Sequence, residues 1–236
     1  KAPIVVSWTY QFWLKKTRMP FVLVAKDLLA LYNLVRTNNV YIPNAVAPVR
    51  HPHKDMEREC KTRFVFVGRF DTQKDVRLAI QAFQHYSRQS KQSCSFDLFG
   101  FGAELEQLEE EFGSSLNIFF RGYDPCVRDK LFEYDVCLVT SWFEGLPGIV
   151  LEALSAGLHV VCTPFISGLT EIAEFSSVTI SDSRDPIQFS QAMATSVSSE
   201  VNQPSDGHAV DTRYSVSAVR LKYKNLFQSL VENEPT

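Results

Sequence analysis

Two glutamates stand eight positions apart in the middle of the chain, Glu144 and Glu152. Glu152 lies in the apolar run 146–158, which predicts a helix that is apolar on all sides and therefore buried. A carboxylate in such a helix must find hydrogen-bond partners or shift its pKa, because burying an unpaired charge is costly. Two interpretations follow at this stage: a carboxylate that binds a polar ligand, or one that pairs with a nearby arginine.

Glu144 belongs to the turn that leads into this helix. The run 134–140 before it predicts a buried strand, and Pro147 suits a first helical turn because its missing N–H costs nothing there. A helix N-terminus offers free amides and a positive dipole end, which favour an anion. The turn therefore predicts a site for a phosphate or a polyhydroxylated ligand, with an ordinary strand-to-helix turn as the alternative.

The bulk composition excludes several classes of protein. The 236 residues, 45% hydrophobic and 22% charged, can form one large α/β domain or one domain with an added piece. A net charge of −3 gives no support for binding nucleic acid. The five cysteines contain no C-x-x-C pair, which favours a reducing compartment over a disulfide framework or zinc site, and Cys137 and Cys162 fall in apolar strands where buried thiols are expected.

No membrane span or signal peptide is expected. The apolar run 19–25 meets Lys26 and Asp27 too early to cross a bilayer. The expected location is the cytoplasm, with peripheral association at the membrane left open. His51 and His53 have no carboxylate or cysteine partners at metal-ligand spacing, so we expect a solvated loop rather than a metal site.

The chain divides into two expected parts, an incomplete N-terminal domain with its linker at 1–55 and a larger domain at 56–236. The first part contains expected strands at 2–8, 21–25 and 40–44 and a helix at 26–35, whose leucines follow helical spacing. The polar stretch 48–63, with its prolines and charges, indicates a linker.

From residue 63 onward, strands and helices alternate. Strands are expected at 64–67, 94–99, 116–120, 134–140, 158–162 and 178–180. Helices are expected at 76–87, from after Gly102 to about 111, and at 125–134, 146–158, 168–175, 185–197 and 214–231. A loop is expected at 200–212. This alternation predicts an α/β fold, a Rossmann-like parallel sheet with helices on both faces. Ligands of such sheets bind beyond the carboxyl ends of the strands.

Residues suited to a pyrophosphate stand at those strand ends. They are Gly68, Arg69 and Lys74 after the first strand, Gly100 and Gly102 after the second, Gly122 after the third, Glu144 to Gly148 after the fourth, and Ser167 to Glu171 after the fifth. Arginine binds phosphate through two N–H groups and lysine supplies a compact charge. Glycines allow a ligand to approach the backbone. Each feature is weak alone, but five strand ends together predict a nucleotide-diphosphate site.

The same residues closely resemble the C-terminal donor-binding domain of retaining, family-4-type glycosyltransferases, the group 1 enzymes with the GT-B fold. The strongest signal is the spacing of Glu144 and Glu152 within Gly-Leu-Pro and Glu-Ala-Leu-Ser-Ala-Gly. The resemblance covers about 64–175, and more loosely the closing helix 214–231. Residues 21–46 resemble the end of the first GT-B domain.

The resemblance implies roles for individual residues. Arg69 and Lys74 would hold the donor diphosphate and offset the charge that grows on it, and Glu144 would lie near the transferred sugar; these three form the expected catalytic set. Glu152 would accept hydrogen bonds from the ribose. The remaining expected donor-binding residues are Gly68, Gly100, Gly102, Gly145, Leu146, Pro147, Gly148, Gly168 and Glu171, the last two shaping the sugar pocket. Neither a metal nor another cofactor is implied.

The chain departs from the family pattern at four positions. Asp75 follows the lysine where glycine is common, which adds a negative charge near the expected phosphate site. Ser167 replaces the first glycine of a Gly-Gly pair, His159 stands where proline is common, and Ala45 follows Asn44 in place of glycine.

The predicted function is transfer of a hexosyl unit, with retention of configuration, from a nucleotide-diphosphate sugar to a glycan or lipid-linked acceptor. Residues 1–55 are too few for a complete acceptor domain. We therefore expect weak donor binding and little transfer by this chain without an N-terminal domain. The alternative is a nucleotide-sugar-binding module that does not catalyse on its own. A related enzyme such as a sugar-nucleotide epimerase would need an acid/base set that the sequence does not offer.

Overall fold

The structure, a computed structural model, describes residues 20–33, 39–49, 61–165, 167–198 and 206–232. The expected strand at 2–8, the histidine pair, Cys60 and the boundary between residues 55 and 56 lie outside these ranges. The division at that boundary therefore stays a prediction.

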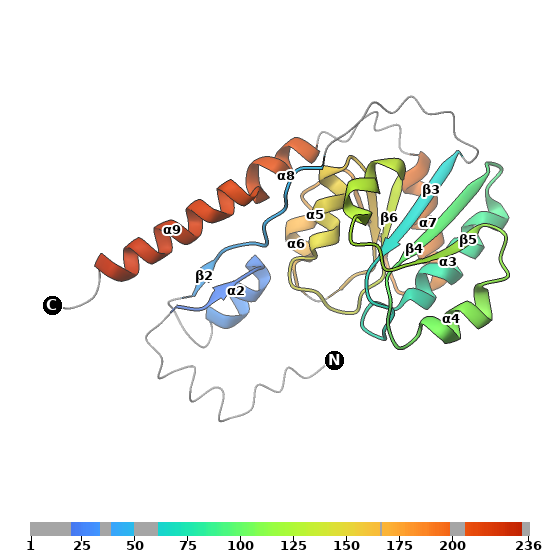
Figure 1. Ribbon diagram of the computed structural model, residues 1–236, viewed down its shortest axis with the longest axis horizontal. Coiled ribbons are helices and arrows are strands. Elements are labelled where there is room, and N and C mark those ends of the chain that lie inside the picture. Colours follow the sequence, from blue (N-terminus) through green and yellow to red (C-terminus); the bar gives the residue numbers. More distant parts are fainter. Residues whose placement is uncertain (1–19, 34–38, 50–60, 166, 199–205, 233–236) are drawn as a thin grey trace.

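A six-stranded parallel sheet forms the centre of the molecule, in the order β5-β4-β3-β6-β7-β8 (Figure 1). Its strands are β3 (Thr62–Val67), β4 (Cys94–Phe99), β5 (Ile118–Gly122), β6 (Val136–Val139), β7 (His159–Cys162) and β8 (Val178–Ile180). From β3, the sheet extends to one edge through β4 and β5. It extends to the other edge through β6, β7 and β8. The order reverses between β3 and β6, which is where open parallel sheets bind their ligands. The predicted α/β fold is confirmed.

Alternating side chains of the sheet fill two separate cores. Phe64 and Phe66 point into a core with α3 (Val76–Gln89), α4 (Leu105–Phe112) and α7 (Pro186–Ser198). Val65 points to the opposite core with the 3-10 helix η1 (Val127–Glu133), α5 (Gly148–Ser155), α6 (Leu169–Ile172) and α8 (Asp206–Tyr214). Both faces of the sheet are covered, so the strands are mostly apolar on both faces. The exceptions in β4 are Ser95 and Asp97, which are buried.

Helices η1, α5 and α6 differ from the sequence prediction, and α6 (Leu169–Ile172) is shorter than the helix expected at 168–175. The segment expected as a helix at 125–134 is the 3-10 helix η1. The helix expected at 146–158 is shorter, because Pro147 is its extended N-cap and Gly157 leaves the helix with a φ of +78°. Left-handed glycines of this kind end many helices. The apolar character predicted for α5 is confirmed, since Val150, Leu151 and Leu154 are buried.

The expected loop at 200–212 is wrong over its second half. Residues from Asp206 onward form α8, and the closing helix α9 (Val216–Glu232) starts two residues later than expected. Asp206 accepts hydrogen bonds from the Ser177 amide and Ser176 hydroxyl, and Val210 is fully buried. This tertiary packing outweighs the poor helix propensity of the polar, glycine-containing segment.

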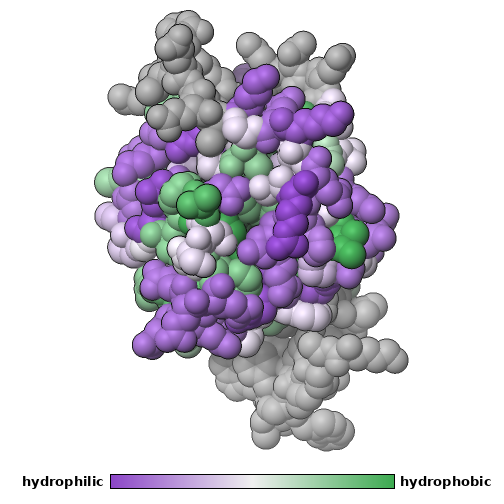
Figure 2. All heavy atoms as spheres, turned by 90° about the vertical axis from the view of Figure 1, so that its right-hand side faces the viewer, coloured by the Kyte–Doolittle hydropathy of each residue, from purple (hydrophilic) through white to green (hydrophobic). Residues whose placement is uncertain are grey.

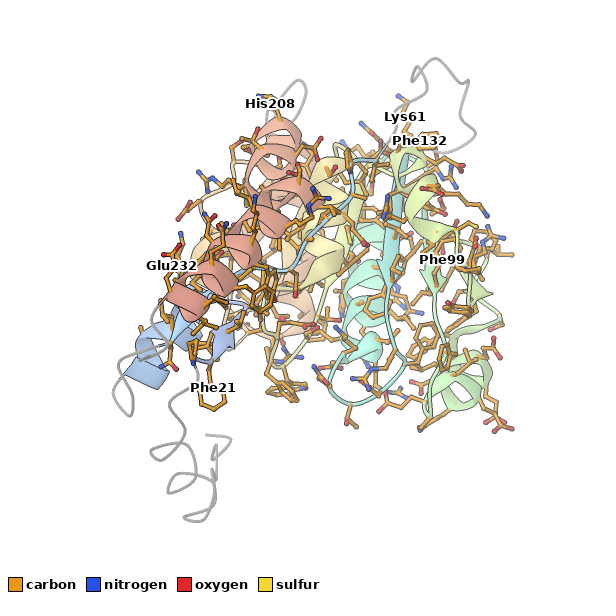
Figure 3. The ribbon with its side chains drawn as sticks, turned by 60° about the vertical axis from the view of Figure 1, so that its left-hand side comes forward. Phe21, Lys61, Phe99, Phe132, His208 and Glu232 are labelled. Atoms are coloured by element: carbon orange, nitrogen blue, oxygen red, sulfur yellow. The ribbon has the colours of Figure 1, made fainter. Side chains whose placement is uncertain are left out.

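The N-terminal segment forms a small unit of its own. Strands β1 (Val22–Leu23) and β2 (Val40–Tyr41) pair in parallel, joined through α2 (Lys26–Asn33). Helix α9 runs beside this unit (Figure 3), and Lys222 Nζ lies 5.1 Å from the centre of the Tyr41 ring. The N-terminal unit is anchored to the larger domain by the bridge between Val46 and Ser215.

The opposite, β5 side of the molecule is mostly hydrophilic, with apolar side chains in small patches (Figure 2). Leu116 and Phe119 are among its exposed apolar residues. No helix in the described parts of the chain is long and apolar enough to cross a membrane.

Candidate functional site

Two turns meet where the strand order reverses. One follows β3 and carries Lys74, and the other follows β6 and carries Glu144. The Lys74 Nζ lies 2.5 Å from Glu144 Oε1, and the Ser141 hydroxyl donates to the same oxygen at 2.6 Å. The side chains of Lys74 and Glu144 are only 19% and 11% exposed. The structure thus joins two sequence-predicted residues, 70 positions apart, in one ion pair.

Backbone contacts fix the two turns against each other. The Trp142 amide donates to the Gln73 carbonyl at 2.8 Å, and the Gln73 side-chain amide donates to the Phe143 carbonyl at 3.0 Å. The Thr140 hydroxyl donates to the Lys74 carbonyl at 2.8 Å. The Lys74–Glu144 pair is therefore fixed by hydrogen bonds between the two turns as well as by the attraction of its charges.

Arg69 lies on the same turn but reaches into solvent. Its side chain is 61% exposed. The guanidinium lies 3.2 Å from the Asp71 carboxylate and donates to the side-chain amide oxygen of Gln73, Oε1, at 2.9 Å. Such surface contacts are weak. The guanidinium can therefore exchange these partners for an anionic ligand at small cost.

The negative charge expected from Asp75 is neutralised. Asp75 has a φ of +48° and a ψ of +57°, the left-handed conformation that explains why glycine suits this position and that aspartate tolerates. Its carboxylate caps α3 through the Leu78 amide and accepts from Arg184 at 2.6 Å. Asp75 therefore does not act as an unpaired anion beside Lys74.

Glu152 is half-buried on the inner side of α5. Burial raises the pKa of its carboxyl above the ordinary value, and the charge of Arg128 on η1 partly opposes this shift. Within the described residues the Glu152 carboxylate has no hydrogen-bond partner. The sequence left open a carboxylate that pairs with an arginine or one that binds a polar ligand. In the structure, Arg128 lowers the pKa of Glu152 through its charge but forms no hydrogen bond with the carboxylate.

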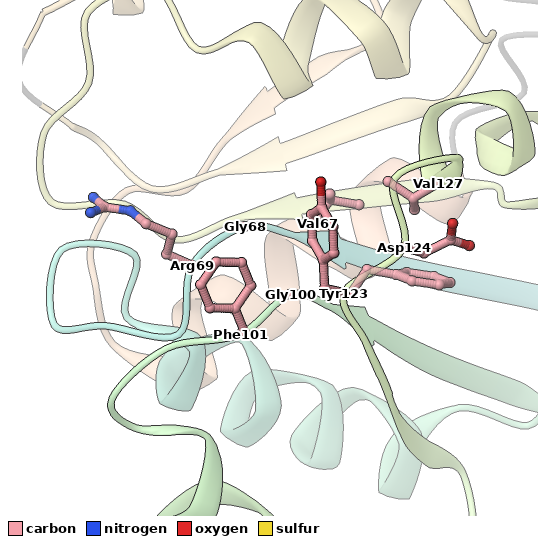
Figure 4. A pocket seen from close by; sticks show the side chains of 9 residues that line it. Val67, Gly68, Arg69, Gly100, Phe101, Tyr123, Asp124 and Val127 are labelled. Atoms are coloured by element: carbon pink, nitrogen blue, oxygen red, sulfur yellow. The ribbon is translucent and has the colours of Figure 1, made fainter.

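An open pocket of about 200 Å³ lies beside the turns that follow β3, β4 and β5. Gly68, Gly100, Phe101, Tyr123 and Asp124 are among its lining residues (Figure 4). The rings of Phe101 and Tyr123 meet edge to face, with centroids 5.6 Å apart, and both are largely exposed. Arg69 extends away from the Tyr123 side of the pocket (Figure 4). The pocket can take a flat, partly apolar group.

The glycines at the strand ends have two different uses. A Cβ on Gly100 would lie 1.8 Å from the Gly68 carbonyl oxygen, and one on Gly102 would lie 2.2 Å from that of Phe70. These two glycines therefore allow the β3 and β4 turns to pack together. At Gly148, by contrast, a Cβ would meet nothing within 4 Å, so the first turn of α5 is open.

The N-terminal unit holds the turn in front of α5. The Asn44 side chain donates to the Leu146 carbonyl at 2.8 Å, and Val24 lies against Gly145. Leu146 itself is buried, and Pro147 adopts an extended conformation. Asn44 makes this contact even though Ala45 follows it in place of the family glycine.

Residues 61–199 match the family described as glycosyl transferases group 1. The chain belongs to this family. A lipopolysaccharide 1,6-galactosyltransferase of Salmonella typhimurium is 27% identical over 153 residues, which make up 61% of this chain and 38% of that protein.

Solved glycosyltransferases share the fold. A glycosyltransferase of Rickettsia africae superposes with a TM-score of 0.79 at 12% identity, over 97% of this chain and 69% of that one. A pneumococcal O-GlcNAc transferase solved with UDP and GlcNAc gives a TM-score of 0.74 at 16% identity, over 95% of this chain and 47% of that one. The chain thus spans well under half of the curated relative and about half of the pneumococcal enzyme.

Two residues expected in the sugar pocket, Gly168 and Glu171, make contacts between chain segments. Glu171 is 1% exposed, and its carboxylate accepts from the Lys26 amide at 2.8 Å and from the Tyr41 hydroxyl. A Cβ on Gly168, whose φ is +73°, would lie 2.0 Å from the Gly145 carbonyl oxygen. The structure therefore places both residues in contacts between chain segments rather than at an open surface.

Sequence reasoning missed four residues that surround the candidate site: Gln73, Arg128, Ser141 and Arg184. Ser141 stood at a strand end and could have been noticed there. The other three carry no local signal, because the partners that bring them to the site are distant in sequence. Among the described residues, no group of three or more His, Cys, Asp or Glu side chains is placed to hold a metal ion.

Proposed function

We propose that this glycosyltransferase chain binds the nucleotide-diphosphate sugar of a retaining hexosyltransferase. The observation that carries the proposal is the Lys74–Glu144 ion pair at the strand-order reversal, with Arg69 exposed on the same turn. The acceptor would be a glycan or a lipid-linked glycan. The galactosyltransferase relative supports a hexose, and a polysaccharide acceptor is the first to test.

Lys74 and Arg69 are suited to the diphosphate. Lys74 is neutralised by Glu144, and the donor phosphates would share that cation with the carboxylate. When the glycosidic C–O bond breaks, its electron pair stays on the leaving diphosphate oxygen. Cations fixed in advance at that point stabilise the developing charge without rearranging.

Glu144 is suited to the other fragment. The sugar carbon develops positive charge as the diphosphate leaves, and a fixed carboxylate stabilises this charge or binds sugar hydroxyls. Ser141 and Lys74 both hold Glu144 Oε1, so the carboxylate is positioned before the donor arrives. The resemblance to retaining enzymes supports retention of configuration.

Glu152 and the open pocket are suited to the nucleoside. The ribose hydroxyls would donate to the Glu152 carboxylate, which lacks a hydrogen-bond partner in the described structure. The base would enter the pocket beside Phe101 and Tyr123. UDP is the first nucleotide to test, because the pneumococcal O-GlcNAc transferase was solved with it.

The proposal needs no metal ion. Lys74, Arg69 and the N-terminus of α5 already supply positive charge for the phosphates. The titrations described next, repeated with EDTA, test this point, and a loss of binding in EDTA would contradict it.

A second candidate is a donor-binding module that does not catalyse alone. It is supported by the length of the match, since the chain corresponds to 38% of the galactosyltransferase relative. The two candidates share the donor site and differ only in transfer.

Calorimetric titration with UDP, GDP and ADP tests the donor site. Lys74→Ala and Glu152→Ala should each weaken binding of the preferred nucleotide about ten-fold or more, since a lost charged contact costs roughly 1.5–3 kcal/mol. Lys91→Ala and Glu109→Ala are matched controls, because both residues are exposed and neither belongs to the site. Equal losses in the controls, or no binding by the folded wild type, would contradict the proposal.

A turnover assay separates the enzyme from the binding module. It measures release of free hexose, or transfer to a glycan, from the UDP-sugar that binds. Donor binding without turnover supports the binding module. Turnover that Glu144→Gln abolishes supports the enzyme.

A further inference from the structure

Arg184 connects three strand ends of the larger domain. It lies between β8 and α7, and its side chain is 16% exposed. One guanidinium nitrogen donates to the Ser141 carbonyl at 2.8 Å and to the Thr163 hydroxyl at 3.1 Å. The other donates to the Thr140 carbonyl at 2.7 Å and to Asp75 Oδ2 at 2.6 Å. The planar, forked guanidinium suits such divided contacts, which a lysine could not make.

These contacts lie on both sides of the Lys74–Glu144 pair. Asp75 directly follows Lys74, while Thr140 and Ser141 stand just before Glu144 in the sequence. The guanidinium also lies over the Trp142 ring, 3.7 Å from its centroid. A single side chain therefore holds the two segments that present the cation and the carboxylate.

Arg184 also determines the net charge around Asp75. The Asp75 side chain is only 25% exposed, so an unpaired carboxylate there would be weakly screened. Because Asp75 directly follows Lys74, this charge would oppose the binding of a diphosphate at Lys74. The ion pair with Arg184 neutralises this charge, so that Lys74 can bind the ligand as well as Glu144.

We propose that Arg184 is the positioning residue of the diphosphate end: it neutralises Asp75 beside Lys74 and fixes the backbone before Glu144. This role rests on the proposed donor-binding function. It also accounts for an aspartate at a position where glycine would fit the backbone, since Asp75 and Arg184 would act as a charge pair.

Titrations with UDP and with uridine test this role, using the wild type, Arg184→Met, Asp75→Asn and the double variant. Asparagine tolerates the left-handed backbone of residue 75 and removes its charge. Arg184→Met should weaken UDP binding about ten-fold, because it leaves a partly buried charge unpaired, and should leave uridine binding unchanged. Asp75→Asn should keep UDP affinity within about two-fold of wild type, and adding it to Arg184→Met should restore most of the loss.

A residue that only stabilises the fold would behave differently. Arg184→Met would then weaken UDP and uridine alike, and Asp75→Asn would restore nothing, and either result overturns the proposal. Should Arg184→Met fail to fold, Arg184→Lys is the substitute. It keeps a positive charge beside Asp75 but cannot make the divided contacts, so it should weaken UDP binding by less than ten-fold and leave uridine binding unchanged, at a lower melting temperature. A loss of UDP affinity of ten-fold or more would overturn the neutralising role.

Lys74→Ala in the same series separates the two proposals. Binding by the wild type that is lost in Lys74→Ala but unchanged in Arg184→Met contradicts the role of Arg184 alone. A folded wild type that does not bind UDP contradicts both.

Discussion

The two halves of the sheet differ in what stands at their strand ends. On the β3-β4-β5 side, glycines pack turn against turn, and Phe101 and Tyr123 line an open pocket. On the β6-β7-β8 side, Thr140, Ser141 and Thr163 are bound by one arginine. A nucleotide sugar has the same division, with a flat base at one end and a charged diphosphate next to a polar sugar. The strand-order reversal places the two environments side by side.

A second difference concerns the two carboxylates of Glu171 and Glu152. Both oxygens of Glu171 already accept hydrogen bonds from the N-terminal unit. Glu152 is half-buried, and burial raises its pKa. A carboxylate whose oxygens are satisfied within the protein stabilises the fold, whereas one held without partners is available to a ligand. The following predictions test these two differences, from the largest expected effect to the smallest.

Gly100→Ala should have the largest effect on stability. The new Cβ would overlap the Gly68 carbonyl oxygen, and residue 100 has a φ of +148°, which alanine rarely adopts. Strain and overpacking together predict a loss of about 4 kcal/mol in the free energy of unfolding. Urea unfolding measures it. Gly148→Ala is the control, because its Cβ would enter open space and should change stability by less than about 1 kcal/mol. Similar losses in both variants would contradict the packing argument.

Glu171→Ala should destabilise the fold by about 3 kcal/mol, because the Lys26 amide and the Tyr41 hydroxyl would lose their buried acceptor. Urea unfolding again measures the change. Glu174→Ala removes an exposed glutamate that pairs with Lys26 and Arg213 and should cost less than about 1 kcal/mol. If the Glu171 variant keeps full stability but loses donor binding, Glu171 belongs to the ligand site after all.

Glu152 should make donor affinity depend on pH. Ribose hydroxyls donate to the ionised carboxylate, so binding favours loss of its proton. As pH falls through the raised pKa of Glu152, affinity for a UDP-sugar should decrease, and Glu152→Gln should bind weakly with a flatter profile. A UDP-sugar is used because its phosphates do not titrate near neutral pH. A wild-type profile as flat as that of the variant would contradict the assignment.

The stability of the unliganded chain should change with pH in the opposite direction. Between the ordinary pKa of 4.5 and the raised pKa, the folded state binds more protons at Glu152 than the unfolded state does. This residue's contribution therefore favours folding more strongly as pH falls through that window. Comparing the denaturation midpoints of wild type and Glu152→Gln across the window isolates the contribution.

Phe101→Ala should have the smallest effect, a loss of about 1 kcal/mol in UDP binding, because it removes one exposed ring beside the base. Inorganic pyrophosphate should bind equally well to wild type and variant. Leu116→Ala serves as the control, since Leu116 is also an exposed apolar residue but does not line the pocket. A loss of pyrophosphate affinity would place the pocket on the diphosphate end instead.

The sheet was largely predictable because each strand carries its own signal. Buried parallel strands are short apolar runs, and each run ended near a glycine or a charged turn residue. The strand ends also predicted that Lys74 and Glu144 share one edge. What local patterns missed were the 3-10 conformation of η1 and helix α8, whose buried Val210 depends on tertiary packing.

The contacts of the site were less predictable, because they join residues far apart in the chain. Glu171 lies 145 positions from Lys26, and Arg184 lies 109 positions from Asp75. No periodicity or spacing encodes such pairs. Asp75 was therefore seen as an added negative charge, and its partner became visible only in the folded chain.

The strand-order reversal also determines when the site forms during synthesis. Strands β3 and β6 are neighbours in the sheet, yet all of β4 and β5 lies between them in the sequence. As the chain leaves the ribosome, the pocket side with Phe101 and Tyr123 emerges first. Glu144 appears later, and Arg184 later still. Translation proceeds at about 5–20 residues per second, so Asp75 and Lys74 wait several seconds for their partners. The end proposed for the diphosphate is therefore assembled last, after the half that would receive the base.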